Sequence, residues 1–466
     1  MAVPLILRIT TDQHSPAVAG FAGDPFVRTP HLDRLASRGT VLANHYCASP
    51  ICVPGRYSMM TGRLPREIGT IDFWDVLPSD TPTYASVLGD SGYQTTCVGK
   101  MHFHGSDQMH GWHFRPYGDM EQLNRTSLPG YSADKDRFQA WREPAFRYSD
   151  HGGYTASMLK FARPGNDKYI LFDESVIRES ILHLTDYYQG LVADIEDYQG
   201  TRPLLFEASF KTPHCPFVCP PDLFEYYMDV LPMPAKPGDP RAPEFIRRRR
   251  DAEQPDWVTP EMARRARAGY WGLVEWVDRQ IGRLLQTVED LGLLDDTVIL
   301  YTSDHGEMAG ERGLWQKSCF YEESARVPTI LAGRGIPQGN VVTDCTSHLD
   351  LLPTLCEWAE TEPPSGLRGR SLLPVCRGES NLERVVFGEL YQRSNLQEYA
   401  LMARQSGLKL IRYSTGESEL FDLKTDPAEQ CNLWPESAER AAVLDDALAG
   451  LPAPFRVGQP DWKLEP

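Results

Sequence analysis

Three short apolar runs, each followed at once by polar residues, restrict the fold of this chain more than any other feature of its sequence. The runs cover residues 5–10, 203–210 and 297–301, and the polar residues behind them are Thr11-Asp12-Gln13, Lys211-Thr212-Pro213-His214 and Thr302-Ser303-Asp304-His305-Gly306. Uninterrupted apolar runs of this length are typical of strands that are buried on both faces. Arg8, a charged residue inside the first run, fits this interpretation poorly.

A strong helix signal lies between the second and third runs. Thr259 is suited to the N-cap, Pro260 to the first helical position and Gly292 to the C-terminal end. One face is apolar at helical spacing, which indicates core packing: Tyr270, Leu273, Val274, Val277, Ile281, Leu284, Leu285 and Val288. A helix that leads into a buried strand is typical of βαβ units, so we predict an α/β fold with a large, mostly parallel sheet flanked by helices. Ligands of such sheets bind beyond the carboxyl ends of the strands, and the polar strand ends therefore predict the rim of a binding site.

The C-terminal part of the chain has a different pattern. At 466 residues the chain exceeds the size at which one hydrophobic core usually stops growing. The composition changes through Pro363-Pro364-Ser365-Gly366, and shorter alternating segments follow. Residues 398–413 and 417–423 have the pattern of antiparallel strands with a turn at Ser414-Thr415-Gly416. We therefore predict a large domain at residues 1–365 that holds the site, and a smaller C-terminal α+β domain with an antiparallel sheet at residues 366–466.

Composition disfavours several classes of function. The formal net charge of −17 opposes long-range attraction to nucleic acid, anionic membranes and highly sulfated polymers, so an anion would need a local basic pocket. The first residues lack the basic region of a signal peptide, and no apolar run reaches the ~20 residues that span a bilayer. We expect a folded cytoplasmic protein without nucleic-acid or membrane partners, the alternative being a leader removed from the sequence. A homo-oligomer stays open.

One cysteine lies in a longer motif. The ten cysteines are scattered without a disulfide framework or zinc-finger spacing, and for most of them a buried thiol is expected. Residues 52–63 read CVPGRYSMMTGR, in which Cys-x-Pro-x-Arg is followed by Thr-Gly-Arg. This segment resembles the signature of the type I, formylglycine-dependent sulfatases of the alkaline-phosphatase-like superfamily. Gly55 is a departure, because a serine is common there in the family.

The resemblance implies that a separate formylglycine-generating enzyme oxidises Cys52 to formylglycine. A hydrated aldehyde carries two hydroxyls, so one can attack sulfur and the other can later collapse to expel sulfate by carbon-oxygen cleavage. A serine would release sulfate less easily, and an unmodified Cys52 thiol is the alternative. Arg56 is expected to orient the formylglycine and to counter negative charge as a planar, multidentate donor.

Four polar residues at two strand ends predict a metal site. Asp12 and Gln13 follow the first run, and Asp304 and His305 follow the third. Either pair alone would fit a solvated loop, but parallel strands bring their ends together, which favours a joint site for a divalent cation that includes Cys52. Oxygen-rich ligation favours Ca²⁺, with Mg²⁺ or Mn²⁺ as alternatives, over Zn²⁺. These positions also match the metal-ligand pattern of the resembling family.

Two further elements resemble family motifs. Residues 99–102, Gly-Lys-Met-His, are similar to the Gly-Lys-x-His element, which implies that Lys100 stabilises the attacking oxyanion and that His102 accepts a proton when the intermediate collapses. Residues 213–216 are similar to the Pro-His-x-Pro element, and Lys317 lies where the family has its sulfate-binding lysine. His214 and Lys317 are expected to neutralise charge on the bridging oxygen and the sulfate, and one of them to protonate the leaving group.

The substrate is only partly readable. Residues 100–111 and 310–315 are similar to choline sulfatases and related bacterial small-substrate sulfatases, which implies a small organosulfate ester. Trp74, Trp112 and Trp315 would form an aromatic wall for an aryl or quaternary ammonium group, although core packing is the alternative for each. His104 and His110 are further candidates for substrate contacts.

Two other functions stay open. Phosphonate monoester hydrolases and phosphodiesterases share the superfamily, the formylglycine and the metal site. A non-catalytic binding module on the same scaffold is the second alternative. Lys100 and His102 favour a sulfatase, and the presence of every expected catalytic group disfavours a binding module.

Overall fold

The three apolar runs form neighbouring strands at the centre of a large sheet. The fold comes from a computed structural model, which describes residues 3–119, 158–189, 202–254, 256–380, 382–391 and 398–452. The sheet has eight strands, in the order β10 (Asn340–Ser347), β2 (Gly39–Tyr46), β9 (Ile330–Gly333), β8 (Thr297–Ser303), β1 (Leu5–Asp12), β6 (Leu204–Pro213), β3 (Gln94–Gly99) and β4 (Phe114–Gly118). Only β9 runs antiparallel to its neighbours in this sheet, so the predicted mostly parallel sheet is confirmed.

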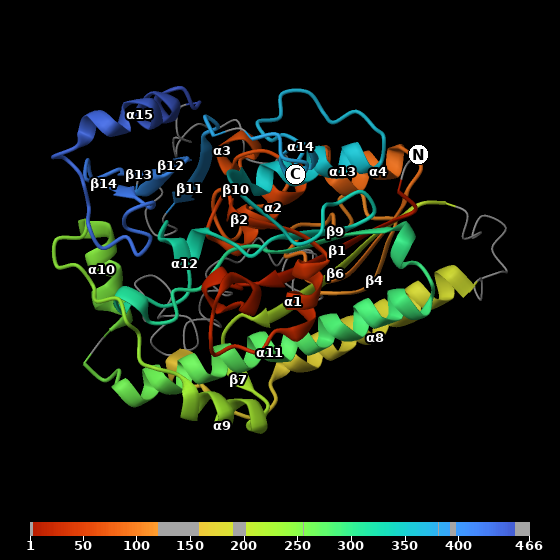
Figure 1. Cartoon of the computed structure of the whole chain (residues 1–466), viewed down its shortest axis with the longest axis horizontal. Coiled ribbons are helices and arrows are strands. Elements are labelled where there is room, and N and C mark those ends of the chain that lie inside the picture. Colours follow the sequence, from red (N-terminus) through yellow and green to blue (C-terminus); the bar gives the residue numbers. More distant parts are fainter. Residues whose placement is uncertain are drawn as a thin grey trace.

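Helices cover both faces of the sheet (Figure 1). Leu5, Leu7 and Ile9 of β1 face one core, while Ile6 between them faces the other, as the period of two requires. The helices packed in the first core are α1 (Pro30–Ser37), α8 (Lys168–Gln189), α9 (Pro221–Val230) and α11 (Pro260–Asp290). Those packed in the second are α2 (Cys52–Thr61), α3 (Pro65–Ile68), α4 (Tyr84–Asp90), α13 (Leu351–Trp358) and α14 (Leu373–Cys376). Within the described ranges, no helix has the length and apolar character needed to cross a bilayer.

Arg8 has a buried partner that the sequence pattern did not reveal. The register of β1 and β6 places it opposite Glu207, and the guanidinium lies 3.5 Å from that carboxylate. The same carboxylate accepts hydrogen bonds from Thr10 and Tyr84, and Arg8 lies over the Tyr84 ring at 4.2 Å. The charge of Arg8 inside the strand is therefore compensated by the paired carboxylate and the Tyr84 ring, and the Glu207 carboxylate by its own hydrogen bonds.

The helix predicted before the third strand is confirmed as α11. The Thr259 hydroxyl accepts a hydrogen bond from the backbone N–H of Met262, as an N-cap should, and Gly292 adopts a positive φ of 72° just beyond the helix. The 3₁₀ turns of the chain are Pro16–Val18, Gly20–Ala22, Leu294–Asp296, Glu311–Gly313, His348–Asp350 and Ala438–Ala441.

A separate antiparallel sheet forms near the C-terminus. Its strands are β11 (Val386–Tyr391), β12 (Tyr399–Gln405), β13 (Leu408–Tyr413) and β14 (Ser418–Asp422), and α15 (Ala442–Ala449) packs with it. The prediction of one strand at residues 398–413 was wrong, because Ser406, with a φ of 47°, and Gly407 turn the chain between β12 and β13. The predicted boundary at residue 365 stays a prediction, and Leu373 beyond it packs in the core of the large sheet.

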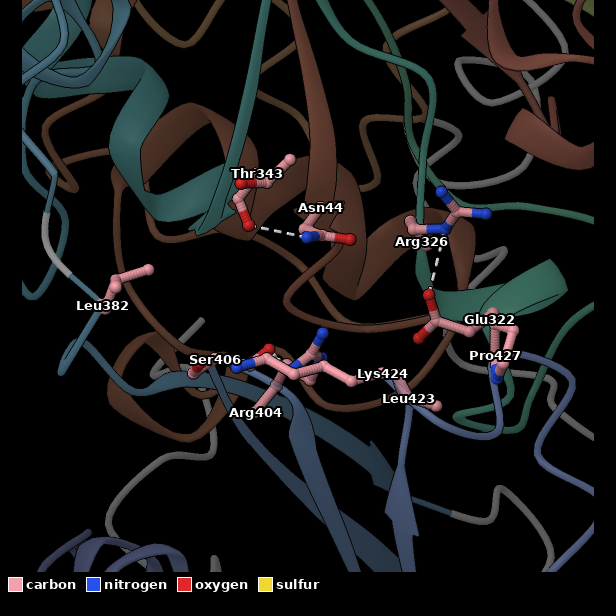
Figure 2. A pocket seen from close by; sticks show the side chains of 10 residues that line it. All are labelled: Asn44, Glu322, Arg326, Thr343, Leu382, Arg404, Ser406, Leu423, Lys424 and Pro427. Carbon is pink, nitrogen blue, oxygen red and sulfur yellow. Dashed lines mark hydrogen bonds and ion pairs between the residues drawn. The ribbon is translucent and has the colours of Figure 1, made fainter.

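The small sheet packs near one end of β2 and β10, and a cavity lies at this junction (Figure 2). The remaining elements are α10 (Glu244–Glu253), α12 (Glu322–Ala325) and the paired short strands β5 (Arg163–Pro164) and β7 (Val218–Cys219).

Candidate active site

The carboxyl ends of β1 and β8 bring Asp12 and Asp304 together. The two strands are parallel neighbours, with Thr11 paired to Ser303, although they lie far apart in the sequence. The backbone N–H of Gln13 donates to Asp304 Oδ1 at 3.0 Å. The predicted meeting of polar strand ends is confirmed.

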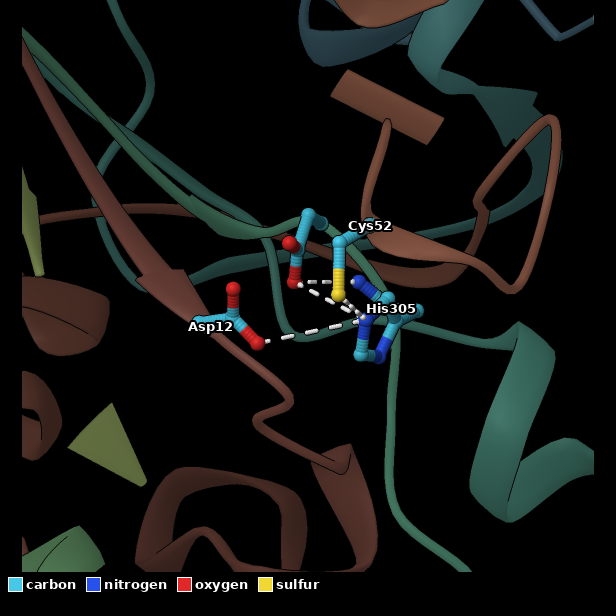
Figure 3. Close-up of side chains that lie close together, drawn as sticks. Asp12, Cys52 and His305 are labelled. Atoms are coloured by element: carbon cyan, nitrogen blue, oxygen red, sulfur yellow. Dashed lines mark hydrogen bonds and ion pairs between the residues drawn. The ribbon is translucent and has the colours of Figure 1, made fainter. Parts of the chain in front are cut away.

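Cys52 lies between these strand ends, as the first residue of α2. It is 1% exposed, and its Sγ lies 3.1 Å from Nε2 of His305. One ligand atom from each of Asp12, Cys52, Asp304 and His305 can be chosen so that all lie within 4.8 Å of one another (Figure 3). Burial and Asp12 would raise the pKa of the thiol, but Lys317, Lys100 and His305 outweigh them, and the pKa is well below its usual range.

Gly55, where the family commonly has serine, has little room for a side chain. A Cβ at this position would lie 2.7 Å from the backbone oxygen of Ser49 and 3.3 Å from that of Asp304. The departure from the family motif therefore accompanies a close approach of α2 to the end of β8.

The donors at this site fit a divalent cation. Asp12 Oδ1 is buried and accepts no hydrogen bond from the described residues, which is costly unless another ligand compensates. His305 Nδ1 lies 3.1 Å from the Gly306 carbonyl, so a proton there would leave Nε2 free to bind a metal. Burial and the neighbouring Asp12 raise the pKa of Asp304 to about 6, as expected for a buried carboxyl group that faces a second carboxylate.

The Gln13 side chain forms hydrogen bonds that would compete with metal binding. Its side-chain carbonyl accepts a hydrogen bond from Lys317, and its amide donates to Glu307 at 2.5 Å. Metal ligation by Gln13 stays a prediction. Glu307 is a buried site residue that the sequence analysis did not assign, and burial raises its pKa to about 7.

Arg56 joins four segments of the site. Its guanidinium donates to Asp304 at 2.8 Å, to Asp12 at 3.3 Å, to Ser209 at 3.0 Å and to the Lys100 carbonyl at 2.6 Å. All of these bonds are buried, so Arg56 is placed to fix the two carboxylates and the Lys100 loop rather than to bind a substrate directly. Ser209 was missed in the sequence, where nothing distinguishes it from other serines.

The loop with Lys100 and His102 is held by α2 and by β6. A Cβ at Gly99, which has a φ of 113°, would lie 1.9 Å from the Ser209 carbonyl, so only glycine fits there. Lys100 Nζ pairs with Asp12, and the Tyr57 hydroxyl of α2 donates to the His102 carbonyl at 3.1 Å.

Asp119 is a second residue that the sequence analysis missed. Its carboxylate accepts hydrogen bonds from the backbone N–H groups of His102 at 2.6 Å and Met101 at 3.3 Å, and it pairs with Arg115 at 2.8 Å. His102 has a φ of 65°, a sparsely populated conformation for a non-glycine residue. Asp119 therefore stabilises the conformation that directs His102 toward the site.

His214 and Lys317 form the opposite side of the site. Lys317 Nζ lies 2.9 Å from His214 Nε2, while His214 Nδ1 lies 2.6 Å from the Cys215 carbonyl. Burial and Lys317 lower the pKa of His214. The structure thus gathers the other five predicted catalytic side chains around the Cys52 thiol, with Lys100 and Lys317 both close enough to lower its pKa.

The predicted substrate residues divide into two groups. Trp74 and His104 lie with Phe73 beside His102, where the Phe73 and His102 rings are 4.7 Å apart. Trp112, in contrast, is 3% exposed and packs edge-on against Tyr84 in the core.

His110 and Trp315 also lie in packed surroundings. His110 contacts the Phe103 ring and pairs with Asp107 at 3.4 Å, and Trp315 is fully buried. The structure therefore places Trp112, His110 and Trp315 in packing positions, whereas Trp74 and His104 lie beside His102.

The family of the chain follows from its sequence match. The profile of the sulfatase family matches residues 4–361. The chain belongs to the sulfatase family. Residues 310–449 of this sulfatase also match the C-terminal part of N-sulphoglucosamine sulphohydrolase. As a sulfatase, it is a sulfuric ester hydrolase.

Curated relatives of this sulfatase act on different esters by name. The choline-sulfatase of Rhizobium meliloti (strain 1021) is 34% identical over 442 residues, which cover 92% of this chain and 82% of the relative. The arylsulfatase of Clostridium perfringens is 28% identical over 444 residues, which cover 92% and 90%.

Solved structures share the alkaline-phosphatase-like fold. The phosphonate monoester hydrolase of Silicibacter pomeroyi has a TM-score of 0.72 and 23% identity, and the match covers 95% of this chain and 94% of that chain. At this identity the likeness concerns the fold alone.

Proposed function

We propose that this sulfatase hydrolyses a small organosulfate ester with a formylglycine derived from Cys52 and with a divalent cation, Ca²⁺ first, held by Asp12, Asp304 and His305. The buried cluster of these three side chains around Cys52, flanked by Lys100 and Lys317, is the observation that carries the proposal. The cation would polarise the sulfate oxygens, and the formylglycine would supply a hydroxyl nucleophile.

The residues of this chain divide the remaining work. Lys100 and Lys317 offer positive charge on two sides of Cys52, where the sulfate group must lie. His214, with a lowered pKa and beside Lys317, would lie near the leaving group, and Lys317 would supply a proton there. His102 also has a depressed pKa, about 3, caused mainly by burial, so it is neutral and able to accept a proton at neutral pH.

The substrate proposal rests on the aromatic group beside His102. Phe73, Trp74 and His104 form a cluster of contacting rings, which suits an aryl or quaternary ammonium leaving group. The names of the choline-sulfatase and arylsulfatase relatives point to the same two classes.

The test of the nucleophile is the mass of the peptide that contains Cys52. Protein made together with a formylglycine-generating enzyme should show loss of the thiol and gain of an aldehyde or its hydrate. Cys52→Ser, made in the same way, is the control that should stay unmodified. A Cys52 that remains a thiol in protein made under these conditions would refute the formylglycine mechanism.

Phosphonate ester hydrolysis is the alternative activity. Rates on sulfate and phosphonate esters of the same alcohol separate the two, and we expect the sulfate ester to have the higher kcat/KM. The reverse order would make this chain a phosphonate hydrolase in substance, despite its family.

A further inference from the structure

A cavity of about 380 Å³ lies at the junction of the large and small sheets, built by residues other than those of the active site (Figure 2). Asn44 of β2, Glu322 of α12 and Arg326, which follows α12, line it from one side, and Arg404 of β12 and Lys424 line it from the other. Its volume is in the range of small-molecule sites, which often occur where two structural units meet.

The charges that line this cavity are unequal. Three cationic side chains, Arg326, Arg404 and Lys424, face one carboxylate, Glu322. The Glu322 carboxylate is already neutralised, because Lys409, outside the lining, lies 2.8 Å from it and Arg326, on the lining, lies 3.0 Å from it.

The pKa of Glu322 reports the local potential. Burial alone would raise it, but Lys409, Arg326 and Arg404 outweigh burial and lower the pKa to about 2. Among its charged lining side chains the cavity therefore has three cations and one paired carboxylate, in a protein whose net charge is −17.

Arg404 is a buried cation that forms no ion pair within the described ranges, although Glu322 acts on it electrostatically. It is 3% exposed, and its Nε donates to the Tyr46 hydroxyl at 3.0 Å, while Nη1 donates to the carbonyls of Ser406 and Leu408. Across the described ranges, its guanidinium pairs with no carboxylate and its Nη2 has no hydrogen-bond partner. Burial would lower the pKa of Arg404, but Tyr46, Cys345 and Glu322 outweigh it and raise the pKa, so the guanidinium stays charged and can bind a further anion.

Lys424 supplies a second, more mobile donor at the mouth. It is exposed and forms no ion pair with any residue that the structure describes. A planar guanidinium at the wall and an ammonium at the mouth are the two donor types that proteins combine to bind tetrahedral oxyanions.

We propose that this cavity binds a sulfate or phosphate group, free or attached to a small alcohol, between Arg404 and Lys424. Glu322 stays paired with Lys409 and does not oppose the ligand. Because the hydrolysis of a sulfate ester releases sulfate, an anion of this class is present whenever the enzyme works. The proposal stands on the cavity itself and does not depend on formylglycine or on the metal.

Location is tested by crystals of the protein grown with selenate, a tetrahedral oxyanion with an anomalous signal. We expect an anomalous peak between Arg404 and Lys424, in addition to any peak beside Lys317. A peak at the active site alone would overturn the proposal.

Affinity is tested by calorimetric titration with inorganic sulfate and with glycerol 3-phosphate, at an ionic strength held constant with chloride. Lys424→Ala should raise the Kd of the cavity site about tenfold. The loss of one hydrogen bond to a charged group corresponds to roughly this change in affinity. Lys160→Ala, which removes an exposed lysine far along the sequence, is the control for net charge and should leave every affinity unchanged. Tighter binding of the organic phosphate would identify an attached group, and tighter binding of sulfate a free anion.

The variant distinguishes this site from the active site. Lys424→Ala should keep the wild-type kcat on a sulfate ester when no other oxyanion is present, because the residue is exposed and outside the catalytic cluster. Equal oxyanion affinities in Lys424→Ala and wild type would refute the proposal. Arg404→Lys, which retains the charge but not the planar donor, should weaken binding if it folds.

Discussion

His102 owes its position to a residue that makes no contact with the reacting atoms. Asp119 is 4% exposed, and its carboxylate accepts hydrogen bonds from the backbone N–H groups of Met101 and His102. Arg115 holds that carboxylate in turn and lies 5.1 Å from the centre of the Phe103 ring, so the Lys100 loop is fixed from behind. His102, the base of the proposed mechanism, and its support therefore lie within one stretch of about 20 residues.

Replacing Asp119 should affect turnover more than binding. Asp119→Ala removes both acceptors, so we expect kcat on a sulfate ester to fall about 10²-fold, the lower end of what a positioned base contributes, with KM changed little. Asp119→Glu should recover part of the loss. Peptide mass must first establish equal aldehyde content at Cys52 in all variants. A raised KM with unchanged kcat would assign Asp119 to substrate binding instead.

At the scale of elements, α11 caps another helix from a distance. Thr29 makes no side-chain cap at the start of α1, and the carboxylate of Asp278, in the middle of α11, accepts the N–H groups of His31 at 3.2 Å and Leu32 at 2.8 Å instead. These are two of the donors that every helix leaves free at its first turn. One carboxylate thus fixes the angle at which α1 approaches the longest helix of the described chain.

Asp278 makes stability depend on pH. Burial raises its pKa to about 7, although the two N–H groups lower it. Between about pH 4 and 7 the folded protein therefore binds a proton that the unfolded chain has lost, and stability falls as the pH rises through this window. Relative to wild type, Asp278→Asn should gain up to about 4 kcal/mol between pH 4 and 7 in urea unfolding, since each pKa unit is worth about 1.4 kcal/mol.

The exposed carboxylate Asp290, at the end of the same helix, supplies the matched control. The difference between Asp290→Asn and wild type should not change over the same pH range. A flat difference for Asp278→Asn as well would mean that Asp278 is ionised throughout.

The elements show where sequence alone was sufficient. The strands at residues 5–10, 203–210 and 297–301 were predictable because burial on both faces leaves a mainly apolar run, interrupted by Arg8 in the first and by Glu207 in the second. The turn at Ser406-Gly407 was missed because the apolar pattern continues on both sides of it, although a Ser-Gly pair is itself a turn signal.

The same contrast holds within the site. Asp12, Cys52 and Asp304 were predictable from strand ends and from a dense motif. Asp119, Ser209 and Glu307 act through backbone or side-chain contacts that only the folded chain creates, and each is an ordinary residue in its local sequence. For Trp112 the sequence allowed either packing or substrate contact, because both need the same apolar ring, and only the position of Tyr84 decides.

For the whole molecule, a buried ion network joins the small sheet to the rest. Lys409 of β13 is fully buried and pairs with Glu322 of α12 and with Glu429, while Arg312 approaches Glu429 at 3.8 Å. Burial would lower the pKa of Lys409, but the two glutamates outweigh it and raise the pKa, so the ammonium stays charged. The junction therefore depends on the buried Lys409 ammonium as the counter-ion of both glutamates.

Lys409→Met should cost about 3–5 kcal/mol in the free energy of unfolding, because it leaves buried carboxylates short of a counter-ion. Urea unfolding followed by tryptophan fluorescence measures the loss. Lys424→Met removes an exposed lysine near the same sheet and should change stability by less than about 0.5 kcal/mol. A loss below about 1 kcal/mol for Lys409→Met would indicate that the glutamates are protonated in the folded protein.

Cation binding should also appear in the stability of the whole chain. If Asp12, Asp304 and His305 hold Ca²⁺, adding it to protein treated with a chelator should raise Tm. At a hundredfold excess over Kd, binding should increase the free energy of unfolding by about 2.7 kcal/mol. Asp304→Asn should remove most of this rise, and Asp290→Asn should keep it. An equal rise in both variants would place the cation elsewhere.

The order of strands in the large sheet also determines when, during synthesis, the pocket around Cys52 can form. β1 lies between β6 and β8, so the pocket that encloses Cys52 cannot close until the ribosome has released residues 297–303. About 250 residues separate Cys52 from that point, which at 5–20 residues per second corresponds to roughly 10 to 50 seconds of synthesis. An enzyme that oxidises Cys52 would find the thiol accessible during this interval and buried afterwards, so the rate of translation would set the yield of active sulfatase.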